Sequence, residues 1–238
     1  MEIKKGSYEY VANDNITSLA PENAFALPKK SLKKIDKFFK RTIDIIASFF
    51  GILALLPLTI CIYIANLICK DSGPIFYTQR RIGQNGKIFK MYKFRSMIVG
   101  ADDKLEKYLA GNEEARKEFN KYKKLKDDPR VTKVGKFIRK TSIDEFPQFI
   151  NVLKGEMSLV GPRPYLEKER EDMNGYYQYI VTCKPGLTGL WQISGRSDCT
   201  FSERIDLDME YYNNHDLKMD IKIFFKTVVQ IVKREGAI

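Results

Sequence analysis

The stretch "IIASFFGILALLPLTICIYIANLIC", residues 45–69, contains no charged side chain over 25 residues. At ~1.5 Å per residue such a helix can cross a hydrocarbon core of ~30 Å. A cleavable signal peptide is disfavoured because the run begins about 40 residues into the chain and is too long for a signal's apolar region. The stretch therefore predicts a membrane helix, and a buried helix of a soluble core is the less favoured alternative.

Basic residues flank this run on both sides. Positive charge marks the cytoplasmic side of a membrane, so both ends favour that side. Pro57 lies near the middle, where it removes one backbone hydrogen bond and bends a helix. A re-entrant helix that breaks at Pro57 and returns to the cytoplasmic face satisfies both observations, whereas a straight crossing leaves one flank outside. The flanking cations are Lys29, Lys30, Lys33, Lys34, Lys37, Lys40 and Arg41 before the run, and Lys70, Arg80, Arg81 and Lys87 after it.

Length and charge restrict the class of protein. The chain has 238 residues, so one principal domain is expected. The formal net charge of +11 implies a polyanionic partner, which could be nucleic acid, anionic lipid or a phosphorylated substrate. The four cysteines show no metal-binding spacing and two lie in the apolar run, so a reducing compartment is expected.

Three regions follow from the composition. Residues 1–30 are polar and read as a loosely ordered arm, and residues 31–70 hold a basic amphipathic approach and the membrane helix. Residues 71–238 are expected to form the principal folded domain. The predicted fold class is α+β: a mainly helical domain with a small β-hairpin, anchored by the re-entrant helix and by interfacial amphipathic helices.

The hairpin is predicted over residues 75–97, where "GQNG" separates two strand-like segments and Asn85-Gly86 supplies the positive φ angles of a tight turn. In the second strand the two-residue period places Phe89, Met91, Lys93 and Arg95 on one face, which puts two cations side by side. Residues 101–127 are charged and are expected to form a solvated helix or helical hairpin.

Two further helices are expected near the C-terminus. The first begins near Thr200, with Glu203 as its capping-box partner. The second carries an apolar stripe from Leu217 to Val232, which suits the membrane interface or packing on the core. His215, the only histidine, lies between them and is expected to mark a helix end.

The segment "TSIDEFPQF", residues 141–149, holds two adjacent carboxylates before a proline. Pro147 is tolerated only in the first turn of a helix, so Asp144 and Glu145 are expected in the N-terminal turn of a helix that continues to Gly155. One interpretation is a capping box of Ser142 with Glu145. The other is a catalytic pair, in which a carboxylate acts as nucleophile and another binds a divalent metal.

Nearby cations favour the catalytic interpretation. Arg139 precedes the pair by five residues, Arg163 lies between two prolines, and Lys93 and Arg95 share a strand face. Together these groups could surround a diphosphate.

The segments "KFRSM", "TSIDEFPQFINVLKGEMSLVGPRP" and "KPGLTGLWQISGRSD" closely resemble the bacterial sugar transferase family, the monotopic polyprenyl-phosphate phosphoglycosyl transferases. The resemblance runs from about Lys40 to the C-terminus. Members are phosphotransferases that move a sugar 1-phosphate from a UDP-sugar to undecaprenyl phosphate and release UMP. They start bacterial surface glycans such as capsule, exopolysaccharide and O-antigen.

The resemblance implies roles for individual residues. Asp144 matches the nucleophile that forms an aspartyl phosphosugar intermediate, Glu145 the acidic partner associated with Mg²⁺, and Arg139 a phosphate-contacting arginine. Mn²⁺ is an alternative metal. Pro57 matches the proline of the family's re-entrant helix, and Leu56 replaces the Ser that many members have before it. Further substrate-binding candidates are Lys93, Arg95, Arg163, Lys184 and Arg196.

The wording "LWQISGRSD" resembles the subgroup that transfers glucose 1-phosphate or galactose 1-phosphate, with an N-acetylated sugar as the alternative donor. The expected partners are a UDP-hexose, undecaprenyl phosphate and an anionic phospholipid membrane, without nucleic acid, while a homodimer stays open. The expected location is the bacterial inner membrane, with the catalytic domain on its cytoplasmic face. Two rival hypotheses remain: a membrane-tethered nucleic-acid binder that uses the basic strand "KIFKMYKFR", and a non-catalytic scaffold on anionic lipid.

Overall fold

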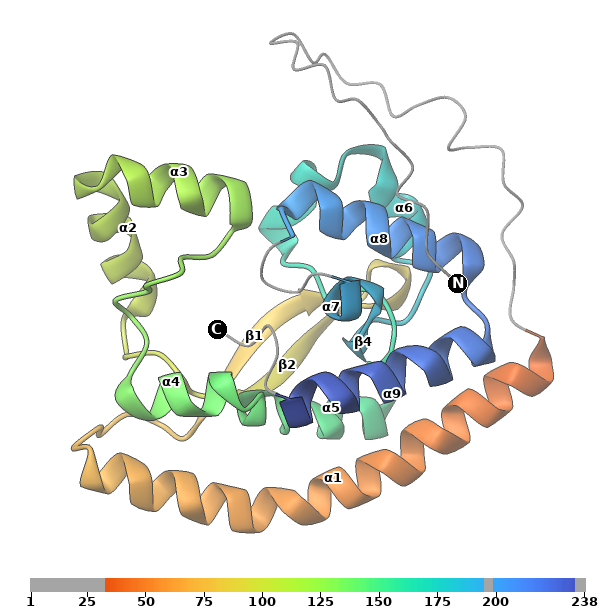
Figure 1. The fold of residues 1–238 in the computed structure, drawn as a ribbon, viewed down its shortest axis with the longest axis horizontal. Helices are drawn as coiled ribbons and strands as arrows, with labels where there is room; N and C mark the ends of the chain where they lie inside the picture. Colours follow the sequence, from red (N-terminus) through yellow and green to blue (C-terminus); the bar gives the residue numbers. More distant parts are fainter. Residues whose placement is uncertain (1–32, 195–198, 234–238) are drawn as a thin grey trace, which may run out of the picture.

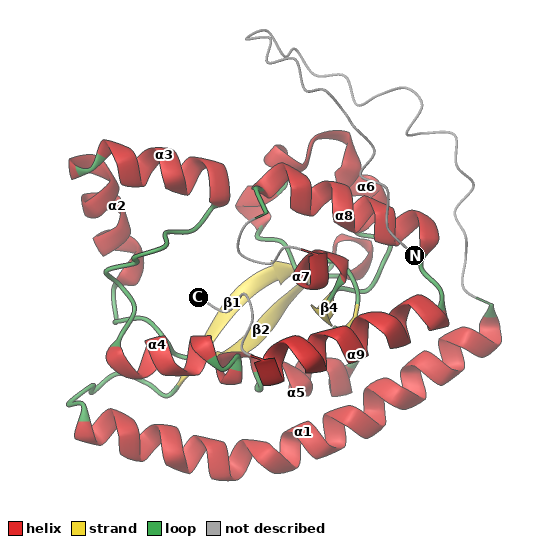
Figure 2. Cartoon of the chain, viewed as in Figure 1, coloured by secondary structure: helices red, strands yellow, loops and turns green. Residues whose placement is uncertain are grey.

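The computed structural model describes residues 33–194 and 199–233. The predicted arm, residues 1–30, lies outside this range. The described chain is mainly helical with one prominent antiparallel strand pair (Figure 2), which confirms the coarse α+β prediction.

The apolar run lies in one long helix, α1, Lys34–Ile68. Only 22% of its most apolar 18-residue window is buried, so it differs from the core helix of a soluble protein. The buried side of α1 is narrow and carries several small or polar residues: Asp44, Ser48, Gly51, Leu55, Ile62 and Asn66. The other sides expose large apolar side chains, as a lipid-facing helix would.

Pro57 lies inside α1, which the structure describes as one uninterrupted helix. The break expected at Pro57 is therefore not seen, and the re-entrant course stays a prediction. A proline removes a single helical hydrogen bond, and the neighbouring turns can continue as a bend. Figure 1 shows α1 bowed, with its concave side toward the rest of the molecule.

The hairpin is confirmed. Strands β1, Phe76–Ile82, and β2, Ile88–Phe94, pair antiparallel around a short 3₁₀ turn, η2, Gln84–Gly86. Asn85 and Gly86 have φ angles of 56° and 76°, as the turn requires.

A helical hairpin follows, made of α2, Ala101–Gly111, and α3, Glu113–Tyr122. Figure 1 shows it projecting beside the main body. The chain then returns through α4, Lys133–Lys140, the 3₁₀ turn η3, Ile143–Glu145, and α5, Gln148–Lys154, which packs on α1.

The C-terminal half contains a small parallel pair that the sequence analysis did not predict: β3, Ser158–Val160, and β4, Gly186–Thr188. Three short helical segments lie between these strands: η4, Glu167–Glu169; η5, Glu171–Tyr176; and α6, Tyr177–Ile180. The last helices follow β4: α7, Leu190–Ser194; α8, Phe201–Asn214; and α9, Leu217–Lys233.

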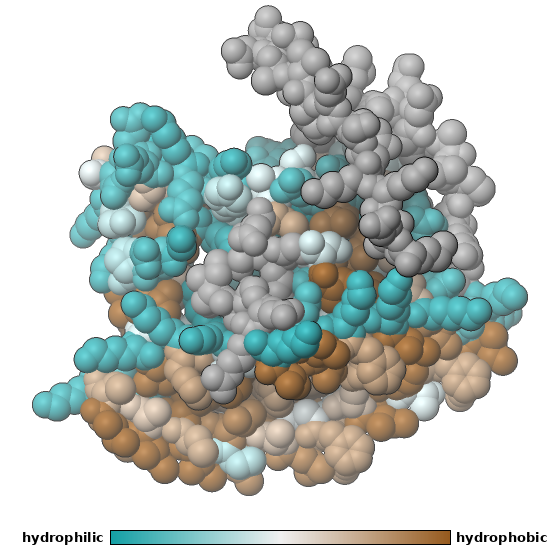
Figure 3. Space-filling model, viewed as in Figure 1, coloured by the Kyte–Doolittle hydropathy of each residue, from teal (hydrophilic) through white to brown (hydrophobic). Residues whose placement is uncertain are grey.

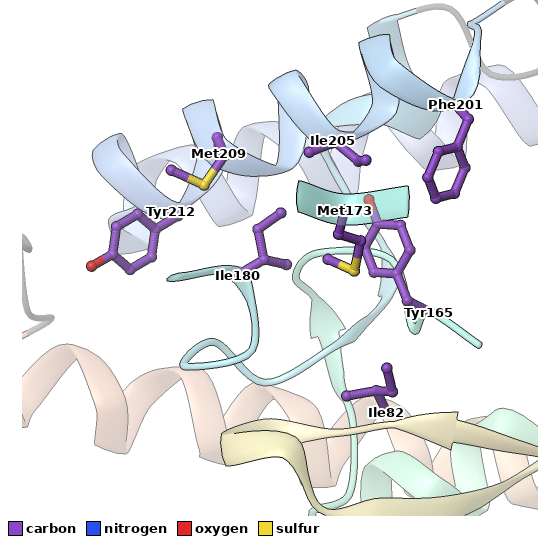
Figure 4. Close-up of a cluster of buried hydrophobic side chains, with 8 residues drawn as sticks. All are labelled: Ile82, Tyr165, Met173, Ile180, Phe201, Ile205, Met209 and Tyr212. Atoms are coloured by element: carbon purple, nitrogen blue, oxygen red, sulfur yellow. The ribbon is translucent and has the colours of Figure 1, made fainter. Parts of the chain in front are cut away.

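Helix α8 begins at the predicted capping box, because Thr200 and Glu203 bond reciprocally to each other's backbone N–H groups. Its buried face packs against Ile180, Met173 and Tyr165, and Ile82 completes this cluster from the end of β1 (Figure 4). His215 ends α8, as expected.

The apolar stripe of α9 is largely exposed. Phe225 is 62% exposed and Val232 76%, whereas Ile223 is buried against the core. Hydrophobic side chains cover the lower surface in Figure 3, over α1 and the adjoining part of α9, and charged ones lie above them. This pattern favours the membrane interface over core packing for the outer face of α9.

Candidate active site

Asp144 and Glu145 lie on the 3₁₀ turn η3, between α4 and α5. The predicted helix start was wrong in detail, because α5 begins at Gln148 with Pro147 as its N-cap. Ser142 adopts a left-handed conformation, φ 57°, and its side chain makes no capping bond in this described segment. The capping-box interpretation is therefore excluded, and the carboxylates do not serve to cap α5.

Asn151 fixes the turn against the hairpin. Its side-chain oxygen accepts a hydrogen bond from Tyr92 N at 3.0 Å, and its Nδ2 donates to Lys90 O at 2.8 Å. This fully buried amide thereby pairs with two backbone groups at the edge of β2 and attaches α5 to that strand. Because η3 directly precedes α5, its carboxylates are held beside the end of β2.

Lys93 of β2 joins the two carboxylates. Its Nζ lies 2.8 Å from Glu145 Oε1 and 3.9 Å from Asp144 Oδ2. The Glu145 contact is a charge-assisted hydrogen bond, and the longer contact to Asp144 is electrostatic. Lys93, a substrate-binding candidate of the sequence analysis, thus lies beside the acidic pair, and its part in substrate binding stays a prediction.

Arg139 approaches from α4. Its Nε donates to Ser96 Oγ at 2.8 Å, and its charge acts on Asp144. Close packing makes this placement possible, because a Cβ on Gly135 would lie 1.9 Å from Ser96 O. Only glycine allows α4 to approach the segment after β2 so closely.

Burial raises the pKa of Asp144 to about 6, and the negative charge of Glu145 adds to this effect, while Lys93 and Arg139 oppose it. The side chain is therefore mainly ionised at neutral pH but binds protons more readily than an exposed Asp. A buried carboxylate with poor solvation and nearby cations is suited to react with a phosphorus centre once the phosphate charge is neutralised.

The predicted pair of Lys93 and Arg95 does not form, because β2 ends at Phe94 and the alternation ends with it. Arg95 is buried and its guanidinium forms a bidentate ion pair with Asp71, at 2.8 and 3.1 Å. The cation that shares the Lys93 face is Arg81, in register opposite Phe89. Sequence reasoning missed Arg81, although the two-residue period of β1, read against the hairpin register, could have found it.

Arg81 extends the cationic surface toward Arg163. Burial lowers the pKa of Arg81 to about 10, and the nearby charge of Arg163 adds to this shift, so the Arg81 guanidinium stays protonated at neutral pH. Glu169 lies 3.9 Å from Arg81 and 3.7 Å from Arg163. Glu145 is close enough to act on the charge of Arg81, which connects this group with the acidic turn.

The guanidinium groups of Arg163 and Arg204 lie 5.6 and 5.3 Å from the ring centroid of Trp191. The backbone N–H of Arg163 donates to buried Asp208 at 3.0 Å, which holds the "GPRP" loop. Within the described residues, four buried donors here have no hydrogen-bond partner: the Nε atoms of Arg81, Arg163 and Arg204 and Nε1 of Trp191. Unsatisfied buried donors indicate a site for a ligand that accepts hydrogen bonds.

Two predicted substrate-binding residues are not placed here. Lys184 is partly buried beside Arg41, Asp44 and Lys40, at the α1 side of the molecule. Arg196 lies outside the described residues.

The arrangement weakens the nucleic-acid hypothesis. Phe89 and Phe94 of the basic strand are 8% and 1% exposed, so they cannot serve as stacking platforms for bases.

Among the described residues there is also no group of three or more His, Cys, Asp or Glu side chains that could hold a metal without another ligand.

A family model of bacterial sugar transferases matches residues 35–234, which is most of the chain. The chain belongs to the bacterial sugar transferase family. The match includes every described residue of the acidic turn and its cations.

Curated relatives share this region. The chain is 46% identical over 205 residues to the undecaprenyl-phosphate galactose phosphotransferase of Salmonella typhimurium, covering 86% of this chain and 43% of that protein. It is 40% identical over 216 residues to the exopolysaccharide production protein ExoY of Sinorhizobium fredii, covering 90% and 95%. It is 39% identical over 206 residues to the UDP-glucose:undecaprenyl-phosphate glucose-1-phosphate transferase of Escherichia coli K12, covering 83% and 41%. The chain thus spans less than half the length of the first curated relatives that it matches.

Proposed function

We propose that this protein transfers a hexose 1-phosphate from a UDP-sugar to undecaprenyl phosphate and releases UMP, with Asp144 as the nucleophile. The observation that carries the proposal is a buried carboxylate, Asp144, positioned between the cations Lys93 and Arg139 in a chain of the bacterial sugar transferase family. The names of the relatives from Salmonella and Escherichia coli support the substrate classes.

The first displacement consumes the donor. An oxygen of the Asp144 carboxylate forms a bond to the β-phosphorus of the UDP-sugar, and the bond from that phosphorus to the bridging oxygen breaks. UMP leaves with the electron pair, and the sugar phosphate stays on Asp144 as an acyl phosphate. Lys93 and Arg139 offset negative charge on the phosphate oxygens, which otherwise repel a carboxylate.

The second displacement consumes the acceptor. A phosphate oxygen of undecaprenyl phosphate attacks the same phosphorus, and the bond to Asp144 breaks, which restores the carboxylate and gives the polyprenyl diphosphosugar. Two successive displacements allow one site to serve a water-soluble and a lipid substrate in turn.

The acidic pair fits Mg²⁺ as a cofactor, because this ion usually takes one or two protein carboxylates together with substrate phosphates. Glu145 and Asp144 would hold it, and it would supply charge neutralisation on the diphosphate. Lys93 already bonds Glu145, so it would share this carboxylate with the metal. The unpartnered donors of Arg81, Arg163 and Trp191 support a place for the donor nucleotide beside this pair.

The position of α1 supports a site at the cytoplasmic membrane surface. Near its start, Arg41 donates to Val152 O and Asp44 accepts from Leu159 N, and just after its end Asp71 pairs with Arg95. Both ends are thus fastened to one catalytic body, which supports a helix that enters one leaflet and returns to the same face. The polyprenyl chain could then stay in lipid while its phosphate reaches Asp144.

Glucose 1-phosphate or galactose 1-phosphate is the proposed group transferred, since relatives with either sugar in their names share the same region. The alternative is the same chemistry with an N-acetylated sugar. A panel of UDP-sugars, each assayed for UMP release with undecaprenyl phosphate, distinguishes these donors.

The central test uses the purified protein with UDP-glucose or UDP-galactose, Mg²⁺ and undecaprenyl phosphate. We expect UMP release from the wild type and none from Asp144→Asn. With donor alone, mass spectrometry should find a hexose phosphate on the peptide that contains Asp144. Asp216→Asn is the matched control, because it removes one carboxylate near the end of α8, away from the site. Equal UMP release from wild type and Asp144→Asn would exclude the proposed nucleophile.

A further inference from the structure

A second cationic site lies at the opposite end of α5 from the acidic turn. Arg41 of α1 donates from Nη1 to Val152 O and from Nη2 to Leu153 O, both at 2.7 Å. These bonds use two of the five guanidinium N–H groups, so further donors remain. The Arg41 guanidinium thus stays in place at the C-terminal end of α5 with capacity for an anion.

Lys184 faces the same small space. The position that a Cβ on Gly155 would occupy lies 3.7 Å from Arg41 Nη2 and 3.8 Å from Lys184 Nζ. Gly155 has no side chain, so no side-chain atom of this residue separates the two cations. Among the described residues Lys184 forms no hydrogen bond or ion pair, although it is partly buried. Burial and the nearby positive charge of Arg41 lower the pKa of Lys184, and an anion between them would relieve this repulsion.

An apolar groove of about 250 Å³ adjoins these cations. It lies between α1, β3 and α9, and residues such as Ile43, Val160, Leu217, Ile221 and Phe225 line it. Lys40 and Asp44 also line the groove and are the charged neighbours of Lys184, so the cationic site and the groove are adjacent. Ile221 and Phe225 are exposed side chains of α9. Figure 3 shows a hydrophobic lower surface over α1 and the adjoining part of α9.

We propose that this combination binds one anionic phospholipid of the bilayer, with its phosphate between Arg41 and Lys184 and part of an acyl chain in the groove. A lipid suits the site because an unpaired cation lies next to an apolar groove that is continuous with the hydrophobic surface. The acidic neighbours offset the pair only in part. Asp220 is paired with Lys40, and Asp44, which accepts from Ser158 and Leu159 N, acts on Lys184 through its charge but forms no ion pair with it among the described residues.

The position of the site argues against the polyprenyl acceptor as its occupant. The acceptor phosphate must contact the phosphorus on Asp144, which precedes α5, whereas Arg41 binds the last carbonyls of α5. The seven residues of α5 alone span ~10 Å along the helix axis. A phosphate between Arg41 and Lys184 therefore cannot react at Asp144, and the bound lipid would anchor the protein.

Native mass spectrometry tests the proposal without any activity measurement. The full chain, purified in mild detergent, is mixed with equal amounts of phosphatidylglycerol and phosphatidylcholine. We expect the wild type to retain one phosphatidylglycerol, and Lys184→Gln to reduce its occupancy about fivefold, as for the loss of one basic residue near a lipid surface. Lys184→Arg should retain the lipid. Lys184→Gln removes no hydrogen bond or ion pair of the described residues.

Two further variants distinguish the contribution of the Lys184 charge to lipid binding from that of the apolar groove. Lys222→Gln removes one exposed charge from α9 and should leave occupancy unchanged. Ile221→Trp fills the groove without changing charge and should reduce occupancy. The proposal is overturned if Lys184→Gln and Lys222→Gln lose lipid equally, or if phosphatidylcholine is retained as well as phosphatidylglycerol. Displacement by inorganic phosphate would show a simple anion site, and one-for-one displacement by undecaprenyl phosphate would show an acceptor site; either result refutes the assignment.

Discussion

The substitution Asp144→Asn is expected to stabilise the folded protein at neutral pH while it removes the nucleophile. Burial raises the pKa of this carboxyl from 3.8 to about 6 in the folded state. Asn has nearly the same shape and no charge, so it avoids the cost of holding a buried carboxylate. Active sites often contain groups that are needed for chemistry and unfavourable for stability.

The pH dependence follows from the direction of the shift. Below pH ~4 the carboxyl is protonated in both the folded and the unfolded chain, so it imposes no penalty. As the pH rises from 3.8 to about 6, the unfolded chain loses this proton first and unfolding becomes more favourable. Above pH 6 the penalty is complete. A shift of about two pKa units corresponds to about 3 kcal/mol, at ~1.4 kcal/mol per unit.

The assay is thermal unfolding in detergent with EDTA and without nucleotide. For a chain of this size about 3 kcal/mol corresponds to a Tm increase of about 6–12 °C. We expect this gain for Asp144→Asn at pH 8 and a much smaller one at pH 4.5. The matched control is Glu145→Gln, which removes the same charge but breaks the 2.8 Å ion pair with Lys93 and should give no gain.

The result that refutes this reasoning is a Tm gain for Asp144→Asn that is equal at the two pH values. A decrease in the Tm of Asp144→Asn at pH 8, relative to the wild type, would also refute it. The first outcome would mean that the gain does not come from the ionised carboxylate. The second would mean that Lys93 and Arg139 stabilise the ionised Asp144 more than burial destabilises it.

Three other outcomes are expected. Arg95→Gln should lower the free energy of unfolding by about 3 kcal/mol, because it leaves Asp71 without its bidentate partner. The KM for the UDP-sugar should not change. A raised KM with normal stability would instead place Arg95 in the substrate site. Gly51→Ala should lower Tm, because the added Cβ would lie 2.4 Å from the ring of Phe149 in α5. The control Gly111→Ala should leave Tm unchanged, because its Cβ meets open space. Equal Tm values for the two variants would contradict the tight contact of α1 with α5. The kcat/KM for the donor should fall about tenfold per pH unit below pH 6 as Asp144 becomes protonated, and an unchanged value at pH 5 would exclude this carboxylate as the titrating nucleophile.

Several features of the site were predictable because they depend on local sequence. The hairpin follows from Asn85-Gly86, which supplies two positive φ angles, and the start of α8 follows from Thr200 and Glu203. The acidic pair was identified because Pro147 restricts where the next helix can begin. The parallel pair of β3 and β4 was not predicted, since each strand has only three residues and shows no usable period.

The site prediction was least accurate for charged side chains whose partners depend on where a strand ends or how two strands pair. The two-residue period placed Arg95 beside Lys93, but the strand ends at Phe94 and Arg95 bonds Asp71 instead. Arg81 was missed because only the pairing of β1 with β2 brings it to the Lys93 face. The two-residue period shows which side chains of one strand share a face. It does not show where that strand ends or how the neighbouring strand is paired with it.

The sequence by itself determined the apolar helix, the hairpin turn, the capping box of α8 and the family, because each depends on residues close together in the chain or on long contiguous motifs. Only the tertiary structure decided which charges meet. Lys93 and Glu145 are 52 positions apart, and Asn151 joins them by bonding α5 to the edge of β2. Such contacts depend on the packing of whole elements, so the partner of a charged side chain cannot be determined from its local sequence.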